Sequence, residues 1–262
     1  LSTEFAYPNA ASSRYLYAPS AIPMEKQQGY VSQKLIFTSV AYAVTDNFTM
    51  LYGALTVFPP ALSVLGFKLG FEVADNVYLG AGGEAFILGL EQEIPVAIGF
   101  GALTLGDQDK NLTIAIGYTD GQALDWEDLS AQVPIMLGGQ LRVGDSLAMI
   151  TENWLFLSTD ELGAGSLVDA PTAFVSSIAF RILGRRDRGT NGMRYLRTAS
   201  GQPRTTWDLG LLAVGYEDRD RWYDDISGEE YISELGSWDV YAPMPWIDWT
   251  WHFGPAGSGV EQ

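Results

Sequence analysis

His252 is the only histidine in the sequence, so acid–base chemistry near neutral pH would depend on it first. Asp248 lies four positions earlier, on the same face if this segment is a strand. At about 3.3 Å per residue the two side chains would stand roughly 13 Å apart, too far for a hydrogen-bonded pair. No serine motif accompanies them, although a triad assembled from separate strands stays open. We therefore expect no catalytic residue and no cofactor.

An acidic run over residues 218–229, "DRDRWYDDISGE", resembles a calcium loop in its spacing. Its acids occupy positions 1, 3, 7 and 12 of an EF-hand pattern. Position 6, however, is Tyr223, where that loop needs glycine for its turn, and position 5 is Trp222. We expect a solvated acidic loop and no metal site. The weak calcium alternative consists of Asp218, Asp220, Asp224 and Glu229.

Residues 184–206 are rich in arginine and contain one acid, Asp187. The planar guanidinium group suits carboxylates and phosphates. The segment is either a solvated insertion or a docking arm for an anionic partner, such as an acidic protein surface or an anionic envelope polymer. The docking candidates are Arg185, Arg186, Arg188, Arg194, Arg197 and Arg204.

Other charged residues occur singly within segments in which bulky apolar residues recur at every second position. In "LGFKLGFEV", for example, Leu65, Phe67 and Phe71 alternate with Lys68 and Glu72. Period two is the pattern of a β-strand with two unlike faces. The charged residues that share the less apolar face are Lys68, Glu72, Glu84, Arg142, Arg181, Asp208 and Asp248.

About twelve such segments follow one another, and no segment has convincing helical periodicity. The alternation is clearest in 62–73, 112–118 and 133–143. Most segments approach the roughly 9–11 residues that a tilted strand needs to cross a bilayer. The predicted strands are 14–18, 30–44, 48–58, 62–73, 77–89, 94–105, 112–119, 133–143, 147–158, 172–183, 207–216 and 240–253.

The connections between these strands alternate in length. Tight turns at 45–47, 74–76, 106–111 and 144–146 fall on one side of the predicted sheet, and longer pieces at 119–132, 159–170 and 217–237 fall on the other. On that second side the connections at Pro59-Pro60 and at Leu90–Gln92 are nevertheless short. This is the organisation of outer-membrane barrels, in which the short turns are periplasmic. It indicates that the apolar faces meet lipid, and that both termini and the insertion 184–206 are periplasmic.

The composition agrees with a membrane barrel and excludes a nucleic-acid partner. Charged residues make up 18% of the chain, below the roughly 25% of soluble domains. The net charge of −17 leaves no basic footprint for nucleic acid. An uncharged window at 48–67 could be taken for a membrane helix, but Pro59-Pro60 would break it. Two strands joined at these prolines are predicted instead.

The last strand, "PWIDWTWHF", places Ile247, Trp249, Trp251 and Phe253 on one face. Exposed aromatics on the edge strand of a soluble sheet would promote aggregation, whereas indole rings are favoured where a membrane meets water. The predicted membrane-interface aromatics are Trp246, Trp249, Trp251 and Phe253.

The aromatic alternation that ends at Phe253 resembles the C-terminal signal strand of Gram-negative outer-membrane β-barrel proteins. The runs "VTDNFTM", "VADNVYLGAGG", "NLTIAIGY" and "ITENW" resemble a family of uncharacterised barrels of that kind. The resemblance covers most of residues 14–253 and implies an outer-membrane location. It implies no particular activity.

We therefore expect an all-β, antiparallel, up-and-down transmembrane barrel of about twelve strands. It would form a single domain over residues 1–253, with a periplasmic N-terminal segment (1–13) and a C-terminal tail (254–262). The leading function is a passive channel for small solutes, with the charged face lining its lumen. The alternative is a non-conducting structural subunit of a larger envelope complex, its lumen filled by its own ion pairs. The expected partners are the lipid bilayer and envelope proteins that contact 184–206.

Overall fold

The computed structural model describes residues 9–89, 93–120, 132–158, 171–183, 205–218, 221–223, 230–232, 237–241 and 243–254. These residues are almost entirely in strands, turns and bends, and their one helical turn is the 3-10 turn η1 (Pro59–Ala61). No helix in the described ranges is long and apolar enough to span a membrane.

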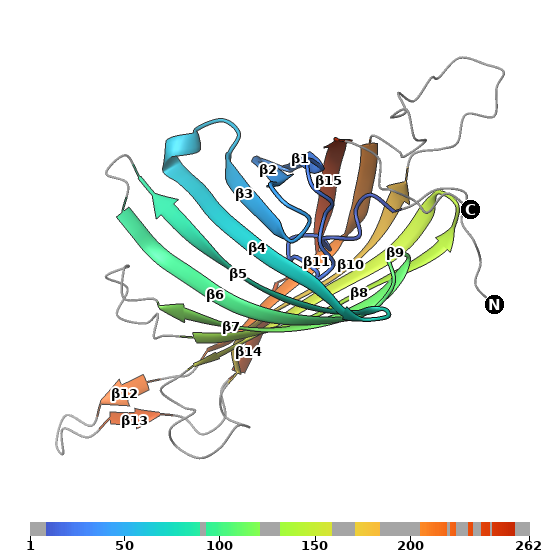
Figure 1. The fold of residues 1–262 in the computed structure, drawn as a ribbon. Coiled ribbons are helices and arrows are strands. Elements are labelled where there is room, and N and C mark those ends of the chain that lie inside the picture. Colours follow the sequence, from blue (N-terminus) through green and yellow to red (C-terminus); the bar gives the residue numbers. More distant parts are fainter. Residues whose placement is uncertain are drawn as a thin grey trace, which may run out of the picture.

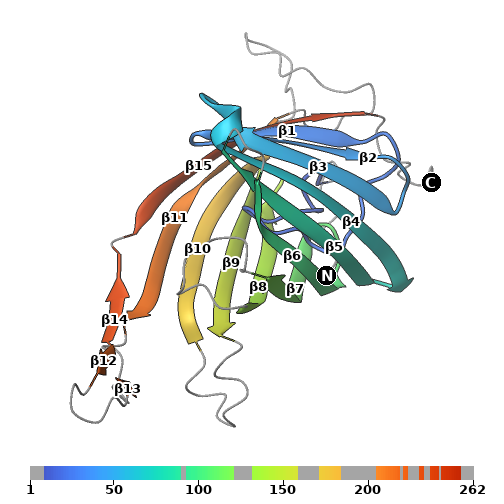
Figure 2. The ribbon, with the colours of Figure 1, turned by 90° about the vertical axis from the view of Figure 1, so that its left-hand side faces the viewer.

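Twelve antiparallel strands form a closed up-and-down barrel. Each strand from β1 to β11 pairs with the next, and β15 closes the ring by pairing with both β1 and β11. Figure 2 shows these strands following one another around the wall. They are β1 (Gly29–Lys34), β2 (Phe37–Ala43), β3 (Phe48–Leu55), β4 (Leu62–Ala74), β5 (Val77–Leu88), β6 (Glu93–Gly106), β7 (Lys110–Asp120), β8 (Gln132–Gly144), β9 (Leu147–Ser158), β10 (Pro171–Leu183), β11 (Thr205–Asp218) and β15 (Met244–Phe253).

Three short strands lie outside this ring. β14 (Ser237–Val240) pairs with β11 beyond the end of β15, so the last strand of the wall consists of two parts. β12 (Arg221–Tyr223) and β13 (Glu230–Ile232) pair with each other.

The turns explain why neighbouring strands fold back on each other. β4 and β5 are joined by Asp75 and Asn76, and Asn76 has the positive φ of 60° that asparagine tolerates in a turn. Gly106 ends β6 with a φ of 111°, and a Cβ there would meet the carbonyl oxygen of Lys110. At Pro59 and Pro60 the chain forms η1, so the uncharged window 48–67 is two strands, as predicted.

The strands have an apolar outer face, which makes this a transmembrane type of barrel. On β7, Ile114 and Ile116 are 52% and 58% exposed, while the alternating Thr113 and Ala115 are buried. Leu65 and Phe67 on β4 are exposed in the same way. A soluble sheet would bury this face, whereas a barrel in hydrocarbon presents it to lipid.

The predicted strand count is right, but two of the predicted strands are wrong and their errors cancel. Residues 14–18 are not a strand of the wall: Arg14 forms only an isolated bridge with Pro19. Segment 30–44 is two strands, β1 and β2, joined at Leu35 and Ile36. Both faces of 30–44 are partly apolar, and this turn contains none of the usual turn residues, so the alternation conceals it.

The two ends of the barrel differ. At one end, here called the turn end, β4–β5, β6–β7 and β8–β9 are joined by two or three residues. The opposite end is called the loop end. Gly29 at the start of β1 pairs with Phe253 at the end of β15, so the wall begins and ends at the turn end.

The barrel wall is uneven in length. β1 and β2 have 6 and 7 residues, whereas β4 to β11 have 11 to 14. The pairing of β1 with β15 ends at Lys34 and Asp248, so Met244 to Trp246 continue toward the loop end beside β11 alone. The wall is therefore lowest at the β1–β2 hairpin.

Candidate functional site: the barrel lumen and its plug

Residues 9–28 fold into the barrel from the turn end, and we call this segment the plug. Figure 1 shows it in dark blue inside the wall. Ala18, Ser20 and Ala21 are completely buried, and Ala11 is nearly so. Of the predicted N-terminal segment 1–13, residues 1–8 lie outside the described residues, and 9–13 belong to the plug.

Apolar contacts hold the middle of the plug. Tyr15 and Leu16 belong to a buried cluster with Met136 of β8 and Ile150 of β9, and Ala179 of β10 completes the contact. Small residues on the inner face leave room for this chain, because close backbone approach requires short side chains. The plug thus packs as part of the protein core.

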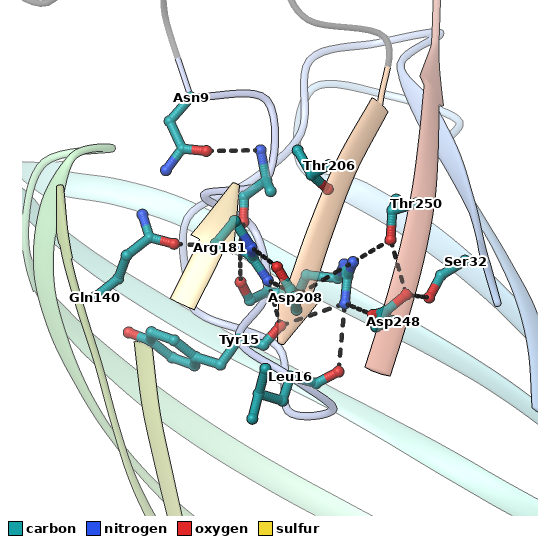
Figure 3. A network of polar contacts seen from close by, with 12 residues as sticks. Asn9, Tyr15, Leu16, Ser32, Gln140, Arg181, Thr206, Asp208, Asp248 and Thr250 are labelled. Carbon is teal, nitrogen blue, oxygen red and sulfur yellow. Dashed lines mark hydrogen bonds and ion pairs between the residues drawn. The ribbon is translucent and has the colours of Figure 1, made fainter. Parts of the chain in front are cut away.

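Arg14 ties the plug to the last strand. Its guanidinium forms an ion pair with Asp248 at 2.9 Å and also bonds to Thr250, while Ser32 donates to the other Asp248 oxygen at 2.7 Å. Figure 3 shows this network. Burial by itself lowers the pKa of Arg14, but the negative charges of Asp248 and Asp208 outweigh it and leave that pKa raised. Arg14 therefore stays charged inside the barrel.

Arg181 of β10 holds the same segment from the neighbouring part of the wall, because β11 pairs with both β10 and β15. It is fully buried and forms a two-point pair with Asp208 of β11, with both N···O distances 2.7 Å. Its remaining hydrogens are donated to the plug carbonyls of Ala11, Arg14 and Tyr15 and to the side chain of Gln140. One guanidinium thus satisfies a buried carboxylate and three backbone acceptors.

Glu152 and Lys68 bind the plug backbone by opposite charges. One carboxylate oxygen of Glu152 accepts the N–H groups of Leu16, Tyr17 and Ala18 at 2.8–3.0 Å. The Lys68 ammonium donates to three plug carbonyls at 2.8–3.0 Å, on Ser13, Ser20 and Ile22. These contacts saturate both groups and fix a segment that has no strand partner of its own.

The other predicted lumen residues are distributed differently. Glu84 accepts a hydrogen bond from Tyr17 and does not pair with Lys68, whose ammonium is taken up by plug carbonyls. Arg142 is buried near the turn end and pairs with Asp109 at 2.8 Å. Glu72 is exposed at that rim. The turn-end half of the lumen therefore holds a mostly satisfied polar network and a folded chain.

His252 lies in this polar half, with Nε2 3.3 Å from the Thr206 hydroxyl and its ring edge-on to Tyr30. Asp248 is engaged by Arg14 and Ser32. Across the described part of the chain, no group of three or more histidine, cysteine or acidic side chains could hold a metal ion.

Trp246 faces the lumen, so its predicted place among the membrane-interface aromatics is wrong. It shares the inward face with Asp248, because residues two apart on a strand point the same way. It packs against the plug cluster as a half-buried side chain. Trp249 and Trp251 do face outward, each 37% exposed, and the ring of Phe253 stacks on Tyr42.

Two predicted sites lie outside the described residues. The arginine-rich connection joins β10 to β11 at the turn end, but its six arginines fall within 184–204. Of the calcium candidates only Asp218, the last residue of β11, is in a described strand. Partner docking and the weak calcium alternative therefore stay predictions.

Sequence reasoning missed the plug and the residue that holds it most directly, Glu152. Nothing in "ASSRYLYAPSAIP" distinguishes an inward-folded segment from a short strand. The available signal was Arg14, a lone charge among small and aromatic residues that could not face lipid. Glu152 lies in β9, where alternation is indistinct.

The plug packs so closely against the lumen wall that a larger side chain on the wall should displace it. A Cβ at Gly138 would come within 2.7 Å of the Tyr15 ring, and one at Gly70 would come within 2.5 Å of the Ala21 carbonyl oxygen. We expect Gly138→Leu to lower the free energy of unfolding by about 1–3 kcal/mol and to displace the plug. Urea unfolding in lipid vesicles measures the first effect, and protease digestion near residue 15 measures the second.

Gly99 provides the matched control for this substitution, because a Cβ there meets nothing within 4 Å. Gly99→Leu should leave both stability and protection unchanged. If Gly138→Leu behaves in the same way, the plug does not pack against β8.

The loop-end half of the lumen has a different character. A cavity of about 740 Å³, here called the chamber, lies beyond the plug, whose Leu16 and Tyr17 contribute to its lining. Inward-facing apolar side chains make up most of its described wall. They include Phe37, Leu62, Phe86, Leu88, Phe156 and Leu212.

Comparisons with known proteins add little to this picture. No protein-family model and no curated protein matches the chain. Among solved structures, the crystal structure of Pseudomonas aeruginosa OccK11 (OpdR) is similar to it at 11% sequence identity with a TM-score of 0.32. The match covers 86% of this chain and 62% of that one, so this chain spans less than two thirds of that protein's length.

Proposed function

We propose that the protein is an outer-membrane channel for small solutes, closed at rest by residues 9–28 and opened when this plug moves. The apolar outer face supports a membrane location. The observation that carries the gating proposal is the plug itself, which fills the polar half of the lumen without forming part of the wall. In this position the segment would obstruct a permanently open pore.

The orientation proposed from the connections is that of Gram-negative barrels. The turn end would face the periplasm and the loop end the exterior. Both termini and the arginine-rich connection would then be periplasmic, where a partner bound to that connection could act on the plug.

The alternative is a non-conducting structural subunit, and the buried ion pairs favour it. Arg14 and Arg181 are buried and each is ion-paired with a buried aspartate, and breaking such a pair costs several kcal/mol. A plug held this firmly could be a permanent part of the fold. The two functions differ in whether current through the barrel depends on plug movement.

A reversible cross-link between plug and wall tests the proposal. Ala21 and Gly80 suit it, because a Cβ built on Gly80 lies 3.2 Å from the Ala21 Cβ, close to the roughly 3.5–4.5 Å of disulfides. The natural chain has no cysteine to interfere. We expect the oxidised Ala21→Cys/Gly80→Cys variant to be silent in planar bilayers and to recover the openings of the natural protein after reduction.

The controls are the two single-cysteine variants and a variant lacking residues 9–28. The single variants should not respond to oxidant, and the deletion should conduct continuously. Equal current in the oxidised and reduced forms would contradict gating by the plug. A natural protein that stays silent at every voltage, beside a conducting deletion variant, would establish the structural alternative.

A further inference from the structure

The chamber contains a buried positive charge without a conventional partner. Lys34, the last residue of β1, lines it and is only 7% exposed. Among the described residues its Nζ forms no hydrogen bond or ion pair, and it lies over the Tyr17 ring, 5.1 Å from the ring centroid. Buried ammonium groups are normally paired, so this one differs from Lys68, which donates three hydrogen bonds.

The neighbouring carboxylates are already engaged elsewhere. Glu152 also lines the chamber, but its oxygens accept three plug N–H groups and the indole N–H of Trp154. Asp248 is held by Arg14 and Ser32. Glu84, a third carboxylate near Lys34, accepts the Tyr17 hydroxyl. None of the three carboxylates is hydrogen-bonded to Lys34, so an external anion can bind its ammonium without displacing one of them.

A second polar donor on the same wall is also unsatisfied. The indole Nε1 of Trp246, another chamber residue, is buried and has no hydrogen-bond partner in the described structure. Buried donors are almost always paired in native proteins. The chamber thus combines two unsatisfied donors with an apolar cavity of about 740 Å³. Ligand pockets typically have volumes of roughly 300–1,000 Å³ and a few polar groups in an apolar wall, so the chamber has the features of a binding site.

We propose that the chamber binds a small amphipathic monocarboxylate, with its carboxylate on Lys34 and its hydrocarbon part against the apolar wall. One cation matches one carboxylate, whereas sugars and other polyols would leave their hydroxyls unpaired against Phe86, Phe156 and Leu212. The proposal rests on the proposed channel function and names its solute class.

The β1–β2 hairpin, where the wall is lowest, offers an apolar molecule a route into the chamber. Leu35 and Ile36, at the tip of the short β1–β2 hairpin, line the chamber and are 56% and 66% exposed. The chamber thus extends to the place where the wall is lowest and its rim is apolar. A molecule with a hydrocarbon part can approach along this rim without crossing a polar barrier.

Binding can be measured without any current, so its outcome is separate from the channel test. The protein in lipid nanodiscs is dialysed against radiolabelled decanoate or decanol, with empty nanodiscs of the same lipid as background. We expect saturable binding of one decanoate per barrel, and decanol at least about tenfold weaker, because it lacks the charge-assisted bond. Lys34→Met should lose the same factor for decanoate alone, and Lys34→Arg should retain most of the affinity.

Two further variants test the charge and the cavity separately. Lys26→Met changes an exposed lysine and should bind decanoate normally. Leu212→Trp narrows the chamber and should weaken both probes. Folding of each variant is verified by its shifted migration on unheated gels. Equal affinities for decanoate and decanol, unchanged in Lys34→Met, would overturn the assignment of an acid. Absence of saturable binding above empty nanodiscs would overturn the chamber as a site.

Discussion

Replacing Arg181 with methionine is expected to lower the free energy of unfolding by about 3–5 kcal/mol, the usual cost of breaking a buried ion pair from one side. The change leaves Asp208, 1% exposed, without its two-point partner, and it leaves three plug carbonyls without a donor. Equilibrium unfolding in urea, with the barrel in lipid vesicles, measures the loss. The plug should also become accessible to protease before the wall unfolds.

A double variant separates the lost pair from lost packing. In Arg181→Met/Asp208→Leu no buried charge is stranded, so much of the stability should return. Lys110→Met, at an exposed position, is the control and should change stability by no more than about 0.5 kcal/mol. If Arg181→Met is as mild as this control, Arg181 does not hold the plug in the membrane-inserted protein.

An arginine introduced on the outer face should lower the free energy of unfolding more, the deeper it lies in the bilayer. Ile116 lies near the middle of β7 and is 58% exposed. We expect Ile116→Arg to destabilise the barrel by about 2–4 kcal/mol in vesicles, because the charge would face the centre of the hydrocarbon. An exposed residue in water would tolerate the same change within about 0.5 kcal/mol. Equilibrium unfolding in urea, with the barrel in lipid vesicles, measures the loss of stability in Ile116→Arg.

Leu105→Arg is the matched control for depth. Leu105 is also exposed on the outer face, but it lies one residue before the end of β6. Its replacement should cost only about 0–1 kcal/mol, because its charge reaches the interface. Equal costs at the two positions would mean that β7 does not cross a bilayer at its middle.

Much of the wall was predictable from the sequence because its rules are local. Wherever bulky and small residues alternate strictly, as in 62–73 and 112–118, the strand and its outward face agree with the prediction. Turn residues such as Asp75 and Asn76 then fix where the chain reverses. Both signals involve neighbours along the chain or one strand away.

The lumen was less predictable because its contacts are distant and often use backbone atoms. Lys68 binds carbonyls 46 to 55 residues away, and any residue type could have supplied them. The inner face is also apolar at Phe86 and Phe156, which conceals the alternation near the loop end. Leu35 and Ile36 turn without glycine, proline or asparagine, and this conceals a strand boundary.

The plug also has a consequence for the order in which the protein folds. Its pair between Arg14 and Asp248 joins residues 234 positions apart, and Arg14 reaches Thr250 over 236. Contacts at such separations carry a large loop-closure entropy and form late. The contacts of Arg14 therefore cannot form before the last strand is in place, although the nearer contacts of the plug with Lys68 can. We therefore expect folding to end with a slow step, in which the plug completes its docking after β15 has closed the barrel.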